Sequence, residues 1–600
     1  MRWTALRDTR GFALEATLML LVLLAALMGA AALGSVMVQR SSGADYRTAK
    51  ATYAAEAGAD HVMAQLNADV RDGVITDAEL AALTAPTIPD FGLTVNAVRV
   101  GASQSRPISS GPYTGLIGLN QRIDMTVTAT DALQDRSDVV LSANAQSIPL
   151  FQFGVFFEED LEITNGPPMV FGGWVHSNGK IYLSSNNQHF QDVISTPDSL
   201  VWQRKDKDLR LTGTWIDNAA GDSINLTFDS RAPGPLGFVG QSQQSFDGRV
   251  RTGESGVVPL RLPLPVGMSP TELVAPRNAG DTPELQTVKL SWLADWQITV
   301  NMAGGLAADP CGAGQIVPLP RPGGKQVPTT IPECQAIFTG RPDAFLEGRE
   351  DSRPDLLQIN VAALHAWVNA NPANRQNSIL YVTFNTAGCS VTTCDYPAIR
   401  LVNGSSLQFP WTIATDRPAY ILGNYNNAGV WRPAAVLADA VTFQSNGWTD
   451  AANDALGEVT ATSGEPQVPQ ELWIYAAIAA GHSATPCDWV DLGCTPSGAF
   501  PNPPLSPSTA NYGGGLENFP RFLENWGGSA TGTFVHYRGS LVSLFESQYA
   551  RRYRWGWRDY YVPPRRDWQF DTRFRDPTQL PPGTPAAGNV IQIAFRPVYR

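Results

Sequence analysis

The first forty residues contain one long apolar run, which predicts a membrane-spanning helix. No charged residue occurs from Ala16 to Val38, a stretch of 23 residues, and Gln39 and Arg40 end it. A helix of about 20 apolar residues spans the hydrocarbon core of a bilayer. A secretory signal peptide and an ordinary signal anchor are the plain alternatives, but a signal peptide has a shorter apolar run and a small-residue cleavage site.

The helical pattern continues beyond this run. Residues such as Tyr46, Tyr53 and Ala57 recur near helical spacing, and no proline occurs before Pro86. A helix from Phe12 to Leu66 would be about 80 Å long at a rise of 1.5 Å per residue. We therefore expect a leader at residues 1–11 and one helix at 12–70, of which residues 12–38 lie in the membrane.

Three segments after the helix alternate between apolar and polar residues with period two, which predicts β-strands. They are residues 93–100, 122–129 and 138–146. The C-terminal segment 589–596 alternates as well, and a strand there needs a partner strand and a core to cover. We expect it to return to a small antiparallel sheet formed by residues 71–150. Residues 586–600 would then close that sheet, and residues 151–585 would be an insertion.

The inserted residues are short apolar runs separated by Gly and Asn turns. Phe153–Phe157 and Val170–Leu183 illustrate this pattern, and Leu356–Val368 predicts a helix. Short strands with tight corners are typical of a parallel β-helix, in which each coil stacks on its neighbours. The expected fold class is therefore α+β, a long N-terminal helix with a small antiparallel sheet and a large inserted irregular β-solenoid. An array of β-sandwiches is the alternative.

The charge of the chain limits its possible partners, and its cysteine content indicates the compartment in which it folds. The chain has 600 residues, 16% of them charged, and a formal net charge of −12, so the whole protein is not an electrostatic match for nucleic acid. Its six cysteines allow fifteen connectivities, and they fall in three sequence-local pairs: Cys311 with Cys334, Cys389 with Cys394, and Cys487 with Cys494. The spacings do not fit a zinc site. An even number of cysteines beyond an export helix indicates disulfides in an oxidising compartment.

Two N-terminal motifs resemble those of the type IV pilin family. Arg10-Gly11-Phe12-Ala13-Leu14-Glu15 resembles its class III signal, and Ala54-Ala55-Glu56-Ala57-Gly58 is similar to a signature of PilX-type minor pilins. The resemblance implies that prepilin peptidase cuts after Gly11 and leaves Phe12 as the N-terminus, which is then methylated. It implies an assembly role for Glu15, which would be the fourth mature residue, whereas the family has its glutamate at the fifth.

Further segments resemble large, ComZ-like pilin-related tip proteins with an inserted β-solenoid. They are Gly172–Gly179, Ala414–Asn426, Ala438–Thr442, Gly515–Trp526 and Pro563–Trp568. The resemblance implies a single-pass inner-membrane protein that moves into an extracytoplasmic filament with other pilin subunits. It also implies a position at the pilus tip, and binding of DNA during natural transformation or of a surface in adhesion and motility. A large pseudopilin of a type II secretion system and an exported polysaccharide-active β-helix enzyme are the alternatives.

Several polar groups could carry chemistry, and each has a structural interpretation that we favour. His176 is interpreted as a hydrogen-bonded turn residue rather than a catalytic base. Asp416, Arg417 and Asp439 are interpreted as a structural ion pair rather than a catalytic carboxylate site. The acidic residues Glu158, Glu159, Asp160 and Glu162 lack the spacing of a calcium loop and are expected at a solvated edge. Glu517, Arg521 and Glu524 have the spacing of a short amphipathic helix that clamps the solenoid.

One basic segment, Tyr549–Asp576, departs from the acidic background. Its arginines alternate with aromatic residues, a composition that suits single-stranded nucleic acid or a glycan. The ligand-binding candidates are Arg551, Arg552, Arg554, Trp555, Trp557 and Arg558. The alternative is that these aromatic residues pack the end of the solenoid and the arginine side chains cover them. We expect no enzymatic activity, cofactor or metal.

Overall fold

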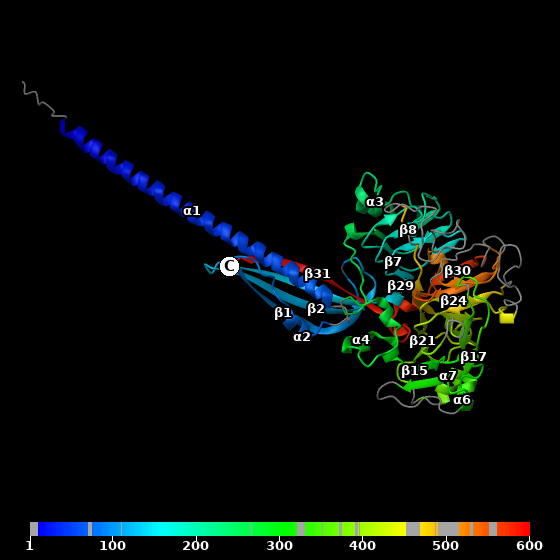
Figure 1. The fold of residues 1–600 in the computed structure, drawn as a ribbon. Coiled ribbons are helices and arrows are strands. Elements are labelled where there is room, and N and C mark those ends of the chain that lie inside the picture. The colour runs from blue at the N-terminus through cyan, green and yellow to red at the C-terminus, as the bar shows by residue number, and fades with distance from the viewer. Residues whose placement is uncertain are drawn as a thin grey trace, which may run out of the picture.

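The computed structural model describes most of the chain. The described residues are 10–69, 75–109, 111–265, 267–320, 331–350, 352–370, 372, 375–389, 394, 396–451, 469–485, 488–489, 515–528, 532–550 and 561–599. They form a long N-terminal helix, a small antiparallel sheet and a large body of mostly parallel strands. Figure 1 shows the helix projecting away from the body, with the small sheet between them.

The N-terminal helix α1 extends over Arg10–Asp69, about 90 Å at the usual rise per residue. It is rich in Ala and Leu, which have high helix propensity. Its C-terminal half packs on a four-stranded sheet, and we call the helix and this sheet the stem. The sheet order is β1 (Phe91–Pro107), β2 (Ile117–Asp131), β3 (Arg136–Pro149) and β31 (Ala586–Tyr599), with every neighbouring pair antiparallel.

The three strands predicted near the N-terminus are present, and each extends beyond the alternating segment that indicated it. Strand β31 pairs with β3 from Ser137↔Tyr599 to Pro149↔Ala586, which is the return expected from the alternation at residues 589–596. The backbone N–H of Leu150 donates a hydrogen bond of 2.8 Å to the carbonyl of Pro585. The chain therefore leaves the stem and re-enters it at neighbouring positions, and the body is inserted between β3 and β31.

The longest sheet of the body has eleven strands, all paired in parallel except β15 with β16. In spatial order it contains β14 (Val250–Arg251), β10 (Ile194–Ser195), β7 (Val175–Ser177), β4 (Val155–Phe157), β29 (Leu541–Glu546), β26 (Ala477–His482), β23 (Ala434–Ala438), β21 (Trp411–Thr415), β19 (Ile379–Asn385), β15 (Trp296–Asn301) and β16 (Ile316–Pro320).

Four smaller sheets complete the body. One contains β11 (Leu200–Val201), β8 (Ile181–Leu183) and β5 (Leu161–Ile163); another contains β13 (Ser223–Asn225), β12 (Thr214–Asp217), β9 (Gln188–Phe190) and β6 (Met169–Phe171). A third contains β17 (Phe338–Arg341), β18 (Pro354–Asn360), β20 (Tyr396–Val402), β22 (Ala419–Leu422), β24 (Val441–Gln444) and β27 (Arg521–Phe522). The fourth contains β25 (Leu472–Tyr475), β28 (Phe534–Gly539) and β30 (Arg565–Phe570), all parallel.

The chain path through the body begins in the middle of the long sheet. It enters at β4 and runs outward through β7, β10 and β14, then crosses to the opposite end and returns through β15, β19, β21, β23, β26 and β29. On the way back the strands of the long sheet alternate along the sequence with strands of the six-stranded sheet. The last strand of the returning half, β29, pairs in parallel with the first strand of the outgoing half, β4.

The helices of the body are short. They are α3 (Gly237–Phe246), α4 (Pro283–Val288), α5 (Leu290–Leu293), α6 (Ile331–Ile337) and α7 (Val361–Ala370), while α2 (Asp77–Ala82) belongs to the stem. The helix predicted at Leu356–Val368 is partly wrong, because residues 354–360 form strand β18 and the helix begins at Val361. Leu356, Leu357 and Ile359 are buried in the six-stranded sheet, where parallel pairing with β20 overrides their helix propensity.

Candidate functional site: the two apolar halves of the N-terminal helix

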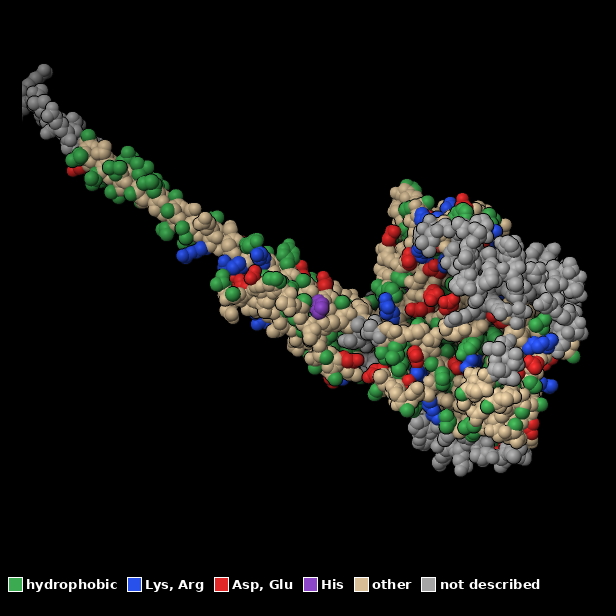
Figure 2. Space-filling model, in the orientation of Figure 1, with side chains coloured by type: hydrophobic (Ala, Val, Ile, Leu, Met, Phe, Trp, Pro, Cys, Tyr) green, Lys and Arg blue, Asp and Glu red, His purple; other side chains and the backbone are tan. Residues whose placement is uncertain are grey.

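The first half of α1 presents apolar side chains on all sides. Fourteen large apolar residues between Leu14 and Val38 are each 45–75% exposed. They are Leu14, Leu18, Met19, Leu20, Leu21, Val22, Leu23, Leu24, Leu27, Met28, Leu33, Val36, Met37 and Val38. Among the described residues α1 is the one helix that is long and apolar enough to cross a membrane. Figure 2 shows these apolar side chains along the part of the helix that no other element covers.

The proposed processing residues lie at the start of this helix. Gly11 and Phe12 are in its first turn, and Glu15 follows as an exposed residue. The hydroxyl of Thr17 donates hydrogen bonds of 2.9 Å to the carbonyls of Ala13 and Leu14. Glu15 lies on the part of the helix that no other element covers. Burial of its carboxylate in lipid without a partner would be costly.

The second half of α1 has one face buried against the sheet. Ala54, Ala55, Gly58, Val62 and Leu66 all lie on this face. An added Cβ at Gly58 would lie 2.7 Å from Cδ2 of Leu93 and 2.8 Å from Cγ1 of Val127. Only a glycine therefore fits at this point of the helix without a shift of its neighbours. The glycine of the motif at residues 54–58 thus allows the helix to approach the sheet closely.

Polar contacts attach this half of the helix to several parts of the sheet. Thr52 Oγ1 and Ser137 Oγ are 2.9 Å apart, and Arg47 forms an ion pair with Asp135. Near the end of the helix, the side-chain oxygen of Asn67 accepts a hydrogen bond of 3.1 Å from the backbone N–H of Val590. The helix is thereby fixed to β3, to the turn before it and to the C-terminal strand.

The opposite face of the same half points to solvent and carries a narrow row of apolar residues beside Lys50, Asp60 and His61. Tyr46 and Tyr53 are 63% and 70% exposed, and Ala49, Ala57 and Ala64 are exposed along the same side. Lys50 lies over the ring of Tyr46, with Nζ 5.1 Å from the ring centre. We call Tyr46, Ala49, Tyr53, Ala57 and Ala64 the outer stripe.

In the body, His176 is fully buried and hydrogen-bonded at both ring nitrogens. Nδ1 is 2.8 Å from Ser195 Oγ, and Nε2 is 3.0 Å from Asn178 Oδ1. Burial lowers the pKa of His176 to about 4. Its environment is that of a structural residue in a strand, since it belongs to β7, rather than that of a turn residue as predicted from the sequence.

The two aspartates near Arg417 have separate surroundings. Asp416 lies 3.5 Å from Arg417 in an ion pair, whereas Asp439 accepts hydrogen bonds from Ser547 Oγ at 2.6 Å and from the backbone N–H groups of residues 548–550. Burial raises the pKa of both carboxyl groups. Asp439 is therefore occupied in holding the chain after β29, and the ion pair expected from the sequence involves Asp416 alone.

Glu517, Arg521 and Glu524 do not lie on a helix, so this prediction is wrong. Glu517 lies within a short 3-10 turn, Gly515–Asn518, which a cis Phe519–Pro520 bond follows, and Arg521 is the first residue of β27. Glu524 is completely buried and accepts hydrogen bonds of 2.7 Å from the backbone N–H and the hydroxyl of Ser445. Burial raises its pKa to about 7. Glu524 connects two strand ends, as the expected clamp would.

The acidic residues 158–162 are not all at a solvated edge. Glu159 is exposed, but Glu162 is 1% exposed and accepts hydrogen bonds from the backbone N–H of Thr485 at 3.1 Å and from its hydroxyl at 2.8 Å. Burial raises the pKa of Glu162 to about 7. Asp160 forms an ion pair of 2.9 Å with Lys205. The prediction of a solvated edge is wrong for Glu162, because its hydrogen-bond donor, Thr485, lies 323 residues away in the sequence.

Two of the three predicted disulfides are present. Cys311 is bonded to Cys334 and Cys389 to Cys394, with Cα–Cα distances of 5.9 and 5.8 Å. Cys487 and Cys494 lie outside the described residues. Disulfides of this kind indicate an oxidising compartment for the body.

The proposed ligand-binding residues Arg551, Arg552, Arg554, Trp555, Trp557 and Arg558 all lie outside the described residues. The described remainder of the basic segment is residues 549–550 and 561–576. Tyr549 is 37% exposed, whereas residues 561–576 have their large aromatic side chains inside. Trp568, Phe570 and Phe574 are at most 7% exposed, and Arg566 is 8% exposed. For these residues the packing alternative is correct. Arg565 points outward and lies over the ring of Phe534, 4.0 Å from its centre.

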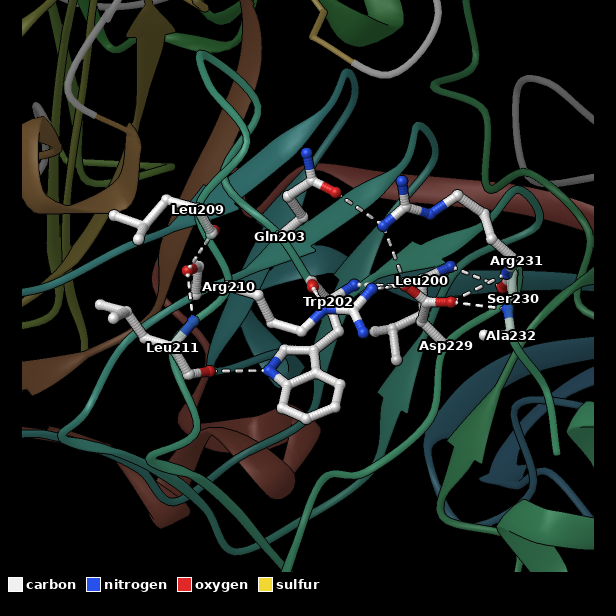
Figure 3. A network of polar contacts seen from close by, with 11 residues as sticks. Leu200, Trp202, Gln203, Leu209, Arg210, Leu211, Asp229, Ser230, Arg231 and Ala232 are labelled. Carbon is white, nitrogen blue, oxygen red and sulfur yellow. Dashed lines mark hydrogen bonds and ion pairs between the residues drawn. The ribbon is translucent and has the colours of Figure 1, made fainter.

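A second group of basic residues, which the sequence patterns did not indicate, surrounds Asp229 (Figure 3). This aspartate is 1% exposed and accepts backbone hydrogen bonds from Trp202, Arg231 and Ala232. Burial alone would raise its pKa, but these N–H donors and the guanidinium of Arg231 hold the pKa below its usual value. Arg210 lies 3.7 Å from the carboxylate and over the ring of Trp202. These arginines thus face an internal carboxylate.

Comparison of the chain with models of known protein families, with curated proteins and with solved structures found no match.

Proposed function

We propose that this chain is a minor, pilin-like subunit of a type IV pilus or a related secretion filament. The observation that carries the proposal is the outer stripe of α1. A helix that only anchors a protein needs about 20 apolar residues. Here exposed apolar residues recur at helical spacing from Tyr46 to Ala64, beyond the membrane-length run, on the side of the helix opposite the sheet. Packing against the helices of other subunits would cover both the first half of α1 and this stripe.

Other features support the same function. Gly11-Phe12 stands at the start of α1, where prepilin peptidase would cut, and Glu15 follows at the position of an assembly carboxylate. The stem has the plan of a pilin, a long helix on a small antiparallel sheet. Before assembly, the first half of α1 would hold the protein in the inner membrane, with the disulfide-bonded body outside.

We further propose that the body is an irregular β-solenoid that occupies the filament tip. The parallel pairing and the alternation of strands between two sheets support a solenoid. Its insertion at the end of the stem remote from the N-terminus supports the tip position, because a body of over 400 residues there would obstruct a subunit stacked above it (Figure 1).

A tip subunit would present its body to DNA or to a surface glycan. The outward face of β25, β28 and β30 supports such binding. The strand register places Trp473, His536 and Asp567 in one row and Tyr475, Arg538 and Gln569 in the next. Trp473 stacks on His536 at 4.7 Å, and Arg538 is paired with Asp567 at 2.8 Å. Aromatic and planar polar side chains on a flat sheet are groups that sugars and bases contact.

Site-specific photo-crosslinking in cells tests the assembly role. A photoreactive residue at Tyr53, in the middle of the outer stripe, should form adducts with other subunits of a sheared filament fraction. The same residue at Val62, which is buried against the sheet, is the matched control and should form no adduct with another subunit. A folded protein that is absent from filaments, or that crosslinks from Tyr53 to no other subunit, would refute the proposal.

A further inference from the structure

A small cavity in the body borders two buried arginine side chains, Arg349 and Arg521. The cavity has a volume of about 20 Å³ and is lined by these arginines, His482, Ser483, Asn518 and small residues such as Ala440. Arg349 is 1% exposed and Arg521 is 7% exposed. A polar cavity of this size holds about one water-sized molecule.

The guanidinium of Arg349 is incompletely paired. Its Nη2 donates a hydrogen bond to the side-chain oxygen of Asn518, a neutral acceptor. Its Nε and Nη1, buried from solvent, have no hydrogen-bond partner among the described residues. Nε carries one hydrogen and Nη1 two, so three N–H groups of one buried cation lack an acceptor. The ring of Tyr561 lies beneath the guanidinium, at 5.4 Å from its centre.

Two carboxyl groups, those of Glu347 and Glu350, lie near both guanidinium groups. Arg521 forms an ion pair with Glu350, and the hydroxyl of Tyr420 donates a hydrogen bond of 2.9 Å to Glu347. Burial raises the pKa of Glu347, and its Oε1 has no hydrogen-bond partner among the described residues. Burial and the nearby charge of Arg521 lower the pKa of Arg349 to about 10, while Tyr561, Glu347 and Glu350 act in the opposite direction. Arg349 is therefore a cation at neutral pH. The Nε of Arg521 also has no partner among the described residues.

We propose that this cavity binds one small monovalent anion, of the size of chloride, between the guanidinium groups of Arg349 and Arg521. A buried N–H group without a hydrogen-bond acceptor is destabilising, and more so when it belongs to a charged side chain. A water molecule accepts about two hydrogen bonds, fewer than the N–H groups that need acceptors, whereas an anion accepts several. This proposal does not depend on the proposed function.

The anion would join parts of the chain that are distant in sequence. The cavity is lined by residues 481–483 after β26, by residues 518–521 before β27, and by Ser547 and Ala550 after β29. The hydroxyl of Ser483 already donates a hydrogen bond of 2.9 Å to the carbonyl of Ala550. The bound anion thus becomes part of the packing of the returning half of the body, and its binding to the folded state raises the unfolding midpoint.

The test is thermal unfolding of the full chain in detergent, in sodium salts of different anions at one ionic strength. Chloride and bromide should raise the midpoint by several degrees over gluconate, which is too large for the cavity, and the rise should saturate with concentration. Formate, a small carboxylate, distinguishes a general anion site from a halide site. Equal midpoints in all salts, or a rise that is linear in concentration, would show that the cavity holds water and would overturn the proposal.

Two variants sharpen this test. Arg349→Met should abolish the difference between chloride and gluconate, whereas Arg573→Met, at an exposed arginine paired with Asp571, should retain it. A chloride effect of equal size in both variants would refute the site. If Arg349→Met does not fold, the native protein crystallised with bromide decides the question. An anomalous peak within hydrogen-bond distance of both guanidinium groups is expected, and its absence would contradict the proposal.

Discussion

Gly58 provides a direct test of how the helix packs on the sheet. Replacement of Gly58 by Ala adds a methyl group that would lie 2.7 Å from Leu93 and 2.8 Å from Val127. Such distances are far below van der Waals contact, so the helix or the strands must move apart. Gly43 is a matched control on the same helix, because a Cβ there meets only the end of Arg47, at 3.7 Å.

The expected change in the stability of the stem is the sum of two opposing contributions. Alanine is favoured over glycine inside a helix by about 1 kcal/mol, and both variants gain this. Overpacking of a tight contact costs about 1–3 kcal/mol, and only Gly58→Ala incurs it. Gly43→Ala should therefore stabilise the stem by up to about 1 kcal/mol, and Gly58→Ala should be less stable than Gly43→Ala by about 1–3 kcal/mol.

Hydrogen exchange of the full chain in detergent measures this difference. The amide protons of β2 and β3 report the opening free energy of the stem separately from that of the body. Gly58→Ala should accelerate their exchange relative to Gly43→Ala by about five- to 150-fold. Equal protection in the two variants would show that the helix does not pack on the sheet as described.

Two further predictions concern the body. Cys311→Ser should destabilise it by about 3 kcal/mol and Cys389→Ser by about 2 kcal/mol, because the first disulfide closes a longer loop. A comparison of the unfolding midpoints of the two variants measures this difference. A lower midpoint for Cys389→Ser than for Cys311→Ser would contradict the loop argument. Burial raises the pKa of Glu524 from 4.5 to about 7, so the fold favours the neutral acid. Its contribution is complete below about pH 4.5 and is lost as the pH rises through 7, by up to about 3 kcal/mol. Glu524→Gln should remove this loss, so an unchanged pH dependence of unfolding would show that Glu524 is ionised throughout.

The stem could be predicted from the sequence because its signals are local. Apolar residues 16–38 indicate a helix by length alone, and the period-two alternation at 93–100 and 589–596 indicates strands that cover a core on one side. The return of β31 to β3 follows from the need of any such strand for a partner. The parallel body has weaker local signals, since many of its strands are buried on both faces and most are three to seven residues long.

The polar groups of the body could not be placed from the sequence, because their partners are remote. Glu162 is held by Thr485, and Arg349 by Asn518, at separations of 323 and 169 residues. The spacing of residues 517–524 favours a helix, but pairing of β27 with β24 makes that segment extended. Local periodicity says nothing about such long-range contacts, and in each case the long-range contact decides the structure.

The N-terminus of the mature protein is the most direct test of the central claim, that this chain is processed and assembled as a pilin-like subunit. The full-length protein would be isolated from two strains, one with prepilin peptidase and one without it, and sequenced from the N-terminus. The account predicts Phe12, as a methylated residue, in the first strain and an uncleaved leader in the second. Cleavage near Ala30 or Ala32 in both strains would instead identify a secreted protein and contradict the account.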